Sequence, residues 1–190
     1  ADIHFQGNPD LITLIGEEVD AEYLKTISAN CVNPAVIKRQ HDLRIVYTPI
    51  HGTGITLVPT ALERIGFTNV HIVQEQATPD GNFPTVVYPN PEEQEAMTLA
   101  MQQAQAIDAD LVIATDPDAD RVGAAVKNQA AGEWQLLNGN QMASLIIYYL
   151  LQAWEDAGKL TGKEFVAKTV VTTEVIDAMC AAYGVPCHNT

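Results

Sequence analysis

Three aspartates at alternate positions form the strongest chemical signal in the sequence. Asp116, Asp118 and Asp120 follow directly after the apolar run 111–114, which has the composition of a strand buried between helices. Ligands of open α/β folds bind at the carboxyl ends of strands, and alternate side chains of an extended loop point the same way. We therefore expect the three carboxylates to converge. Because like charges repel, they should hold a divalent cation, and oxygen ligands favour Mg²⁺.

Arg121 follows the three aspartates directly. Its guanidinium group could bind two oxygens of a phosphate at once. A hard cation beside an arginine is typical of phosphoryl transfer, in which charge neutralisation and positioning supply most of the catalysis. The aspartate loop, residues 116–121, therefore predicts a magnesium site with a phosphate contact at Arg121.

Three other interpretations of the aspartate loop can be compared by spacing. An EF-hand needs glycine and glutamate where this chain has Arg121 and Lys127, so that interpretation fails. A phosphatase with Asp116 as its nucleophile also places Asp-x-Asp after an apolar strand, but such enzymes usually have Thr or Val in place of Asp120. It is the best local competitor. The third is a solvated acidic turn stabilised by Pro117, which would not need three aligned carboxylates and an arginine.

A second loop, residues 48–54, follows the first predicted strand and leads into a helix. Gly52 and Gly54 permit tight turning and close approach of the backbone, so the helix N-terminus could face an anion. His51 and Gly52 are candidate substrate-binding residues, although a histidine in such a loop is more often a structural hydrogen-bonding group. The loop is no dinucleotide fingerprint, because Leu57 occupies the third glycine position. We expect this glycine loop and the aspartate loop to meet at one edge of the sheet.

The elements that position these loops alternate between strand and helix. A helix is predicted to begin at Asn90, with Asn90 as the N-cap and Pro91 in the first turn, and its apolar face predicts burial. The alternation indicates an α/β fold with a mixed, largely parallel sheet flanked by helices. The other predicted elements are strands at 43–48, 70–73, 111–114 and 122–127, a helix at 55–65, and a short helix at 21–30.

A second unit of similar α/β type is predicted from Asn138 onward. A helix should run from 141 to 156, a strand from 165 to 172 and a helix from 174 to 183, with Gly184 at its C-terminal cap. A further strand would open at residue 186. We expect this unit to be incomplete.

Composition narrows the class of protein. The 190 residues allow two compact units, and 47% hydrophobic residues supply cores for them. A net charge of −14 disfavours nucleic-acid binding. Three cysteines without a C-x-x-C pair favour a reduced, cytoplasmic setting. The apolar run 142–151 is too short for a membrane span, which needs about 20 residues. The sequence has no initiator methionine, and we expect a piece of a longer protein.

Together these segments resemble the α-D-phosphohexomutases, the family of phosphoglucomutases and phosphomannomutases. The nearest branch is that of the phosphoglucomutases similar to phosphopentomutase. The likeness covers nearly all of the chain from about Ile45, and the aspartate loop in this setting is highly specific. The motifs that carry it lie at residues 48–54, 83–93, 114–121, 132–134, 137–140 and 170–173.

The resemblance implies a place for each part of the chain among the four domains of the family. Residues 40–135 would be the second, metal-binding domain, and residues 138–190 the start of the third. Residues 1–39 would connect to a first domain that is missing here. The family's serine-bearing segment, sugar-recognition loop and phosphate-binding fourth domain have no counterpart, so we expect the 190 residues alone to be inactive.

The resemblance also implies the chemistry of the parent enzyme. Asp116, Asp118 and Asp120 would hold Mg²⁺ together with an oxygen of a phosphoserine from the first domain, and Arg121 would contact that phosphate region. The phosphoryl group would move from serine to a phosphosugar substrate through a bisphosphate, interconverting sugar 1- and 6-phosphates or pentose 1- and 5-phosphates. The competing hypothesis is a non-catalytic module that binds phosphosugar or metal. Neither hypothesis involves nucleic acid or a membrane.

Overall fold

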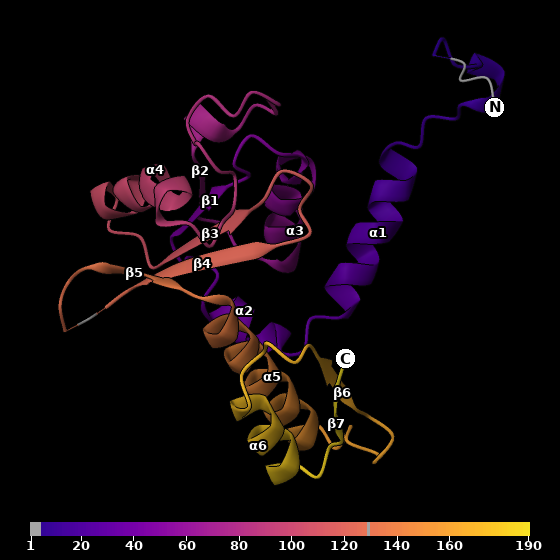
Figure 1. The fold of residues 1–190 in the computed structure, drawn as a ribbon, viewed down its shortest axis with the longest axis vertical. Helices are drawn as coiled ribbons and strands as arrows, with labels where there is room; N and C mark the ends of the chain where they lie inside the picture. The colour runs from indigo at the N-terminus through magenta and orange to yellow at the C-terminus, as the bar shows by residue number, and fades with distance from the viewer. Residues whose placement is uncertain (1–4, 129) are drawn as a thin grey trace.

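A five-stranded mixed sheet forms the framework of the larger part of the molecule (Figure 1). The computed structural model describes residues 5–128 and 130–190. The strand order is β2-β1-β3-β4-β5, with parallel pairing across β2-β1-β3 and antiparallel pairing across β3-β4-β5. This confirms the predicted mixed α/β sheet flanked by helices, with its parallel part limited to the first three strands. The strands are β1 (Ile45–Thr48), β2 (Val70–Ile72), β3 (Leu111–Thr115), β4 (Val122–Lys127) and β5 (Trp134–Leu137).

Helices α4 (Gln94–Ala106) and α3 (Val58–Ile65) cover this sheet, which lies between them in Figure 1. Helix α4 packs on β1 and β3 with a face of small residues, which allows a close approach to the sheet. Val46 and Val112 lie in the resulting core and are fully buried. The predicted burial of this helix face is therefore confirmed. The remaining core members from the sheet and α4 are Ala96, Met97, Ala100, Ala104, Ala114 and Ala125.

The start of α4 differs from the prediction. The helix begins at Gln94 instead of Asn90, with Glu93 as its N-cap. The Asn90 side chain instead accepts a hydrogen bond from the Glu92 backbone amide at 3.0 Å, which forms a separate turn. Pro91 is buried against β4, where a Cβ on Gly123 would lie 2.5 Å from the Pro91 carbonyl oxygen. Packing between this turn and the sheet therefore displaces the helix start.

Two helices precede the sheet, and short 3-10 turns connect its strands. Helix α1 (Glu17–Ala29) packs against α3, where the Arg64 guanidinium group donates to the Ala21 carbonyl oxygen at 3.2 Å. In Figure 1, α1 leads away from the sheet toward the N-terminus. The helix predicted at 55–65 is divided into the 3-10 turn η2 (Thr53–Thr56) and α3. The other short elements are η1 (Pro9–Leu11), α2 (Pro34–Arg39) and η3 (Gln74–Gln76).

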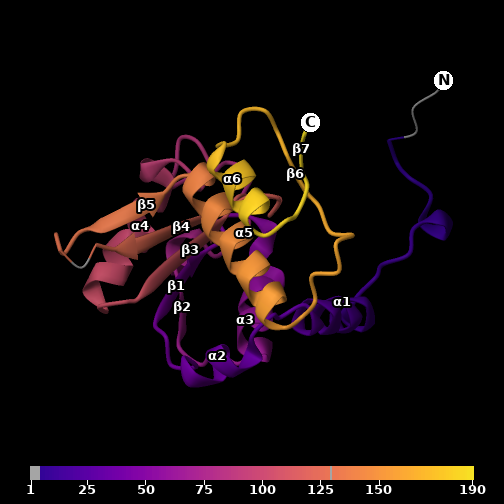
Figure 2. The same cartoon turned by 90° about the horizontal axis from the view of Figure 1, so that it is seen from below.

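A second α/β unit begins at Asn138, which caps helix α5 (Gly139–Asp156) through a capping box with Gln141. It also contains α6 (Val175–Ala182) and a parallel pair of short strands, β6 (Val166–Lys168) and β7 (Cys187–Asn189). Figure 2 shows α5 and α6 side by side. Strand β6 ends four residues before the predicted end at residue 172. The reason is a turn in which the Thr172 amide donates to the Thr169 carbonyl oxygen at 3.0 Å.

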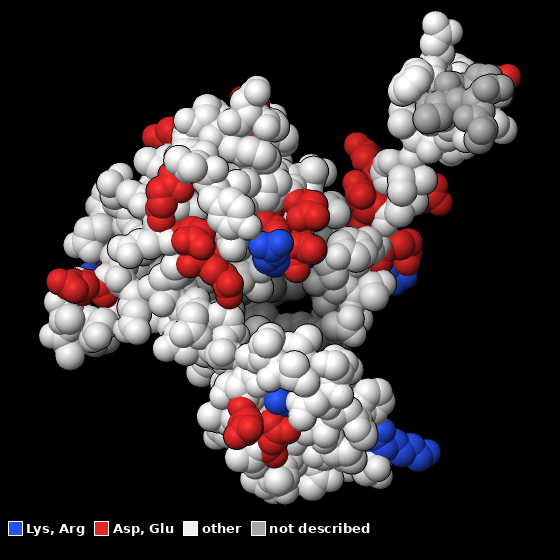
Figure 3. Space-filling model, in the orientation of Figure 1, with Lys and Arg blue, Asp and Glu red and all other residues white. Residues whose placement is uncertain are grey.

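The charged residues are predominantly acidic, with 24 Asp and Glu against 10 Lys and Arg, which gives the net charge of −14. On the face shown in Figure 3, acidic side chains gather on the part that contains the five-stranded sheet, with few basic side chains among them. Within residues 5–128 and 130–190, none of the helices combines the length and the hydropathy needed to cross a bilayer.

Candidate metal centre

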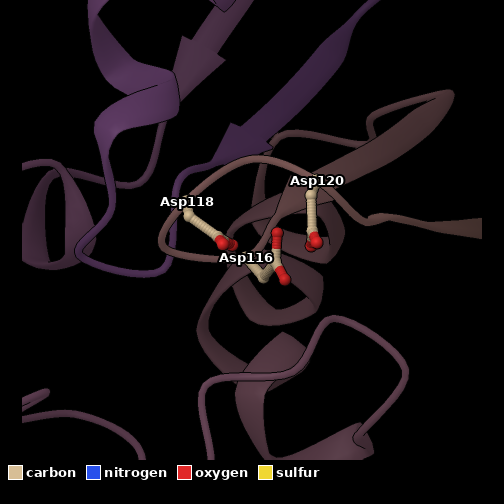
Figure 4. A group of neighbouring side chains, drawn as sticks. All are labelled: Asp116, Asp118 and Asp120. Carbon is tan, nitrogen blue, oxygen red and sulfur yellow. The ribbon is translucent and has the colours of Figure 1, made fainter.

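The three aspartates of the aspartate loop converge (Figure 4). One carboxylate oxygen from each of Asp116, Asp118 and Asp120 lies within 4.8 Å of the others. Asp116 is buried, whereas Asp118 and Asp120 are exposed. The expected gathering of three carboxylates at the end of β3 is therefore observed, in a position that ions in solution can reach.

The backbone that brings the aspartates together is a turn, so the expectation of an extended loop is wrong. The Ala119 amide donates to the Asp116 carbonyl oxygen at 3.0 Å, and Ala119 has a φ of 60°. This left-handed conformation is uncommon for alanine and reverses the chain between Asp118 and Asp120. The loop closes where the Asp116 amide faces the Arg121 carbonyl oxygen at 3.4 Å. The carboxylates thus meet because the chain folds back.

Asp116 is held in place by the end of its own loop. Its Oδ1 accepts a hydrogen bond from the Arg121 amide at 3.0 Å, and its Oδ2 lies 3.5 Å from the Arg121 Nε. The same Nε lies 3.7 Å from the Asp120 Oδ1. Because 55% of the Arg121 side chain is exposed, the guanidinium group can neutralise part of the acidic cluster and still reach an external phosphate oxygen.

The neighbouring carboxylates raise the pKa of Asp120. A hydrogen bond to Asp116 raises the pKa of Asp120, and the negative charges of Asp118 and Asp116 raise it further; only Arg121 opposes the shift. A divalent cation would remove this conflict, since it would attract all three charges at once. The donor atoms are carboxylate oxygens, the ligands that suit Mg²⁺, and three of them leave about three of six octahedral positions for water or phosphate. The residues therefore fit a magnesium ion.

The glycine loop packs directly on the aspartate loop, so the two predicted loops do meet at one edge of the sheet. The Thr53 amide donates to the Pro117 carbonyl oxygen at 2.8 Å, and the Thr53 hydroxyl donates to the same oxygen at 3.1 Å. Gly52 lies so close that a Cβ there would be 2.6 Å from the Pro117 oxygen. Gly54 packs in the same way on the buried hydrogen bond between the hydroxyls of Tyr47 and Thr115. A side chain at either position would collide with these atoms, so the packing requires glycine at both.

His51 lies beneath this junction, and its side chain does not face the aspartates. Only 4% of the residue is exposed. Its Nδ1 lies 3.2 Å from the Thr78 carbonyl oxygen, and its Nε2 lies 2.9 Å from the Thr85 hydroxyl. The geometry agrees with the structural interpretation of His51. It lends no support to the substrate contacts predicted for His51 and Gly52, whose backbone is pressed against Pro117.

Several residues that shape the site were not singled out from the sequence. Thr53 and Pro117 form the junction between the loops, and Gln76 and Thr85 form polar contacts behind it. Thr85 lies 34 positions from its partner His51. No local motif signals such a contact, because the partners belong to different connecting segments.

Comparison with protein families gives two matches that cover most of the chain. Residues 21–132 match phosphoglucomutase/phosphomannomutase, alpha/beta/alpha domain II, and residues 138–190 match domain III of the same family. The first match alone spans more than half of the chain.

Curated relatives agree with these matches. The phosphoglucomutase of Staphylococcus haemolyticus is 45% identical over 113 residues, which are 60% of this chain and 20% of that protein. The phosphoribomutase of Saccharomyces cerevisiae is 38% identical over 149 residues, which are 75% of this chain and 24% of that protein. The chain therefore spans about a fifth to a quarter of the length of these relatives.

A solved structure shares the fold. A phosphoglucomutase/phosphomannomutase family protein from Burkholderia thailandensis superposes with a TM-score of 0.65 at 19% sequence identity, covering 90% of this chain and 32% of that one. At this identity the likeness concerns the arrangement of helices and strands.

Proposed function

Because the chain belongs to the phosphoglucomutase/phosphomannomutase family, we propose that it is the metal-binding segment of an enzyme that moves a phosphoryl group between two positions of a sugar phosphate. The observation that carries this proposal is the convergence of Asp116, Asp118 and Asp120 within 4.8 Å beside Arg121. The mutase names of the curated relatives support the reaction class.

Residues 40–135 would act as the second domain of that enzyme and residues 138–190 as the beginning of the third. The matched ranges 21–132 and 138–190 are compatible with this division. The serine that carries the phosphoryl group, and the first and fourth domains, would be supplied by parts of the protein outside these 190 residues. We expect a cytoplasmic enzyme.

Each side chain of the site would have a distinct task. Asp116, Asp118 and Asp120 would hold Mg²⁺, which when bound neutralises negative charge on the phosphoryl group. Arg121 would orient that group by donating to its oxygens, while its Nε keeps the carboxylates of Asp116 and Asp120 in position. The Thr53 contacts to Pro117 would fix the loop that carries all three ligands. The substrates suggested by the relatives are glucose, mannose or pentose phosphates.

Titration with Mg²⁺ by isothermal calorimetry tests the metal site. The 190-residue chain is expected to bind one ion. Asp118→Asn should weaken binding by at least about tenfold, because losing a charged ligand should cost no less than losing an outer partner residue. Asp10→Asn removes the same charge from an exposed N-terminal position and serves as the matched control. Equal affinities in the two variants would rule out the aspartate loop as the site.

An assay of sugar-phosphate isomerisation tests the parent activity. In the presence of Mg²⁺, the full-length protein should interconvert a sugar 1-phosphate and the corresponding 6-phosphate, or 5-phosphate for a pentose. Residues 1–190 alone should bind the ion without turnover. Turnover by the 190-residue chain would overturn the proposal that an external phosphoserine is needed. A phosphatase with Asp116 as its nucleophile would form an aspartyl-phosphate. Trapping a stable fluoride-metal analogue of that species on Asp116 would therefore favour the aspartate-nucleophile phosphatase.

A further inference from the structure

The backbone behind the aspartate loop is strained at two successive residues. Ile50 has a φ of 47° and His51 a φ of 59°, so both adopt the left-handed region, which is an outlier for a β-branched side chain. Strain of this kind persists only where surrounding contacts over-determine the conformation. Gly52 and Thr53 come next and contact Pro117, between the first two metal ligands. Whatever holds the strained pair therefore also sets the position of the aspartate loop.

A chain of buried and partly buried hydrogen bonds holds this turn. The Ile50 amide donates to the Thr48 hydroxyl at 3.1 Å, and the Thr48 hydroxyl donates to the Gln76 Oε1 at 2.6 Å. The Gln76 Nε2 donates to the Thr85 hydroxyl at 3.0 Å, and the Thr85 oxygen lies 2.9 Å from the His51 Nε2. Thr48 and Gln76 are fully buried. These four side chains, Thr48, Gln76, Thr85 and His51, form what we call the polar relay.

With a neutral His51 ring, the polar relay admits a single arrangement of protons. The Thr78 carbonyl oxygen can only accept, so the His51 Nδ1 facing it at 3.2 Å must carry a hydrogen. In the neutral ring Nε2 is then an acceptor and takes the hydrogen of the Thr85 hydroxyl. That hydroxyl is free to donate, since it accepts from the Gln76 amide on its other side. Each donor in the relay thus has an acceptor, which favours a unique geometry.

Backbone hydrogen bonds on both sides of His51 also hold it in place. The His51 amide donates to the Gln76 carbonyl oxygen at 3.0 Å, and the Asp80 amide donates to the His51 carbonyl oxygen at 3.0 Å. His51 is therefore fixed through its backbone and through both ring nitrogens. The connecting segment 76–85 acts as a support for the glycine loop.

We propose that His51 and Thr85 are positioning residues of the metal centre: through the strained turn they fix Gly52 and Thr53, and through Pro117 they fix the spacing of the aspartate carboxylates. This inference rests on the metal site proposed above. Neither residue touches the ion; Thr85 acts through His51, and His51 acts through the contact of its neighbours with Pro117.

Two substitutions at one position separate positioning from folding. Thr85→Val keeps the shape of the side chain but removes the hydroxyl, whereas Thr85→Ser keeps the hydroxyl. We expect Thr85→Val to weaken Mg²⁺ binding by roughly tenfold, as the loss of outer partner residues does at other metal sites, and Thr85→Ser to restore it. Met101→Ala controls for lost stability, because Met101 packs against the same core from α4 without joining the relay. Equal loss of affinity in Met101→Ala would overturn the proposal.

Nuclear magnetic resonance of the ¹⁵N-labelled, metal-free chain gives a readout that does not depend on the ion. His51 should be a neutral ring with its hydrogen on Nδ1, assigned by the absence of its signals in His51→Asn. The amide signals of Thr53 and Asp118 should move in Thr85→Val and return in Thr85→Ser. If the unaltered chain binds no Mg²⁺, the proposed function fails. The shifts of these amide signals would still show whether the polar relay positions the aspartate loop. A hydrogen on Nε2, or unmoved amides in Thr85→Val, would overturn it.

Discussion

Replacing Gly52 with alanine should separate the two loops that build the metal centre. The φ of Gly52 is −107°, a conformation that alanine also adopts, so the backbone itself does not resist the change. The obstacle is contact: a Cβ would lie 2.6 Å from the Pro117 oxygen and 2.7 Å from its carbonyl carbon. Both are backbone atoms, which cannot rotate away as the end of a flexible side chain can.

The size of the effect follows from these distances. Carbon atoms in contact are separated by about 3.5–4.0 Å, so the loops must part by about 1 Å. The hydrogen bond from the Thr53 amide to the Pro117 oxygen, now 2.8 Å, would then exceed hydrogen-bonding range. Its loss costs about 1 kcal/mol and the residual overpacking about 1–3 kcal/mol, which together give about 2–4 kcal/mol. Pro117 would carry Asp116 and Asp118 with it.

Thermal unfolding and Mg²⁺ calorimetry on the same samples would measure both consequences of Gly52→Ala. The melting temperature should fall by roughly 5–15 °C, and the dissociation constant for Mg²⁺ should rise by about tenfold or more. Gly81→Ala is the matched control, because no atom lies within 4 Å of a Cβ at that exposed position. If Gly52→Ala and Gly81→Ala unfold at the same temperature and bind Mg²⁺ equally, the two loops do not pack as described.

Two further predictions concern charge. Asp120→Asn should raise the melting temperature of the metal-free chain and weaken Mg²⁺ binding, because Asp116 and Asp118 raise the pKa of Asp120 and so disfavour its charged form. The gain should shrink as pH falls through that pKa, since protonation removes the same charge; a gain that is constant with pH would contradict this. Glu164→Gln should lower the melting temperature at pH 7, because hydrogen bonds led by the Thr161 hydroxyl lower the pKa of Glu164 from 4.5 to about 2. The folded-state pKa is depressed, so this deficit should diminish below pH 4.5 as the carboxylate of the unaltered chain is protonated. An equal deficit at pH 7 and pH 3 would refute the assignment.

The sequence predicted the chemistry of the aspartate loop better than its conformation. The residue types and the preceding apolar strand were enough to predict that Asp116, Asp118 and Asp120 converge. The reason was wrong, because an extended loop was expected where Ala119 adopts a left-handed φ of 60°. Pro117 indicated a turn only in the alternative of a solvated acidic turn, and alanine has no preference for the left-handed region, so no residue predicts this conformation at Ala119. The backbone takes this form because β3 and β4 are paired at both ends of the loop.

Errors in the predicted elements come from tertiary contacts. Asn90 has every local mark of a helix cap, yet Pro91 packs under β4 and the helix begins at Gln94. Strand β5 was not predicted, because Trp134–Leu137 is short and lacks the alternation that signals a strand; its partner β4 determines it. The polar relay was equally inaccessible, since its members come from separate connecting segments. Patterns along the chain therefore predicted most of the elements, whereas contacts between distant segments determined their ends and the strand β5.

The aspartate loop is also the connection of a hairpin, which restricts how it can vary. Thr115 pairs with Val122 on either side of six loop residues, and this pairing places Gly123 and Ala125 toward the core. Inserting or deleting one residue in the loop would shift β4 against β3 and turn its inward side chains outward. Substitutions in the loop can change which ion is bound, but a change in loop length would disrupt the register of β4 against β3. The metal-binding residues of the loop can therefore change during evolution, whereas the pairing of β3 with β4 fixes the number of residues between the two strands.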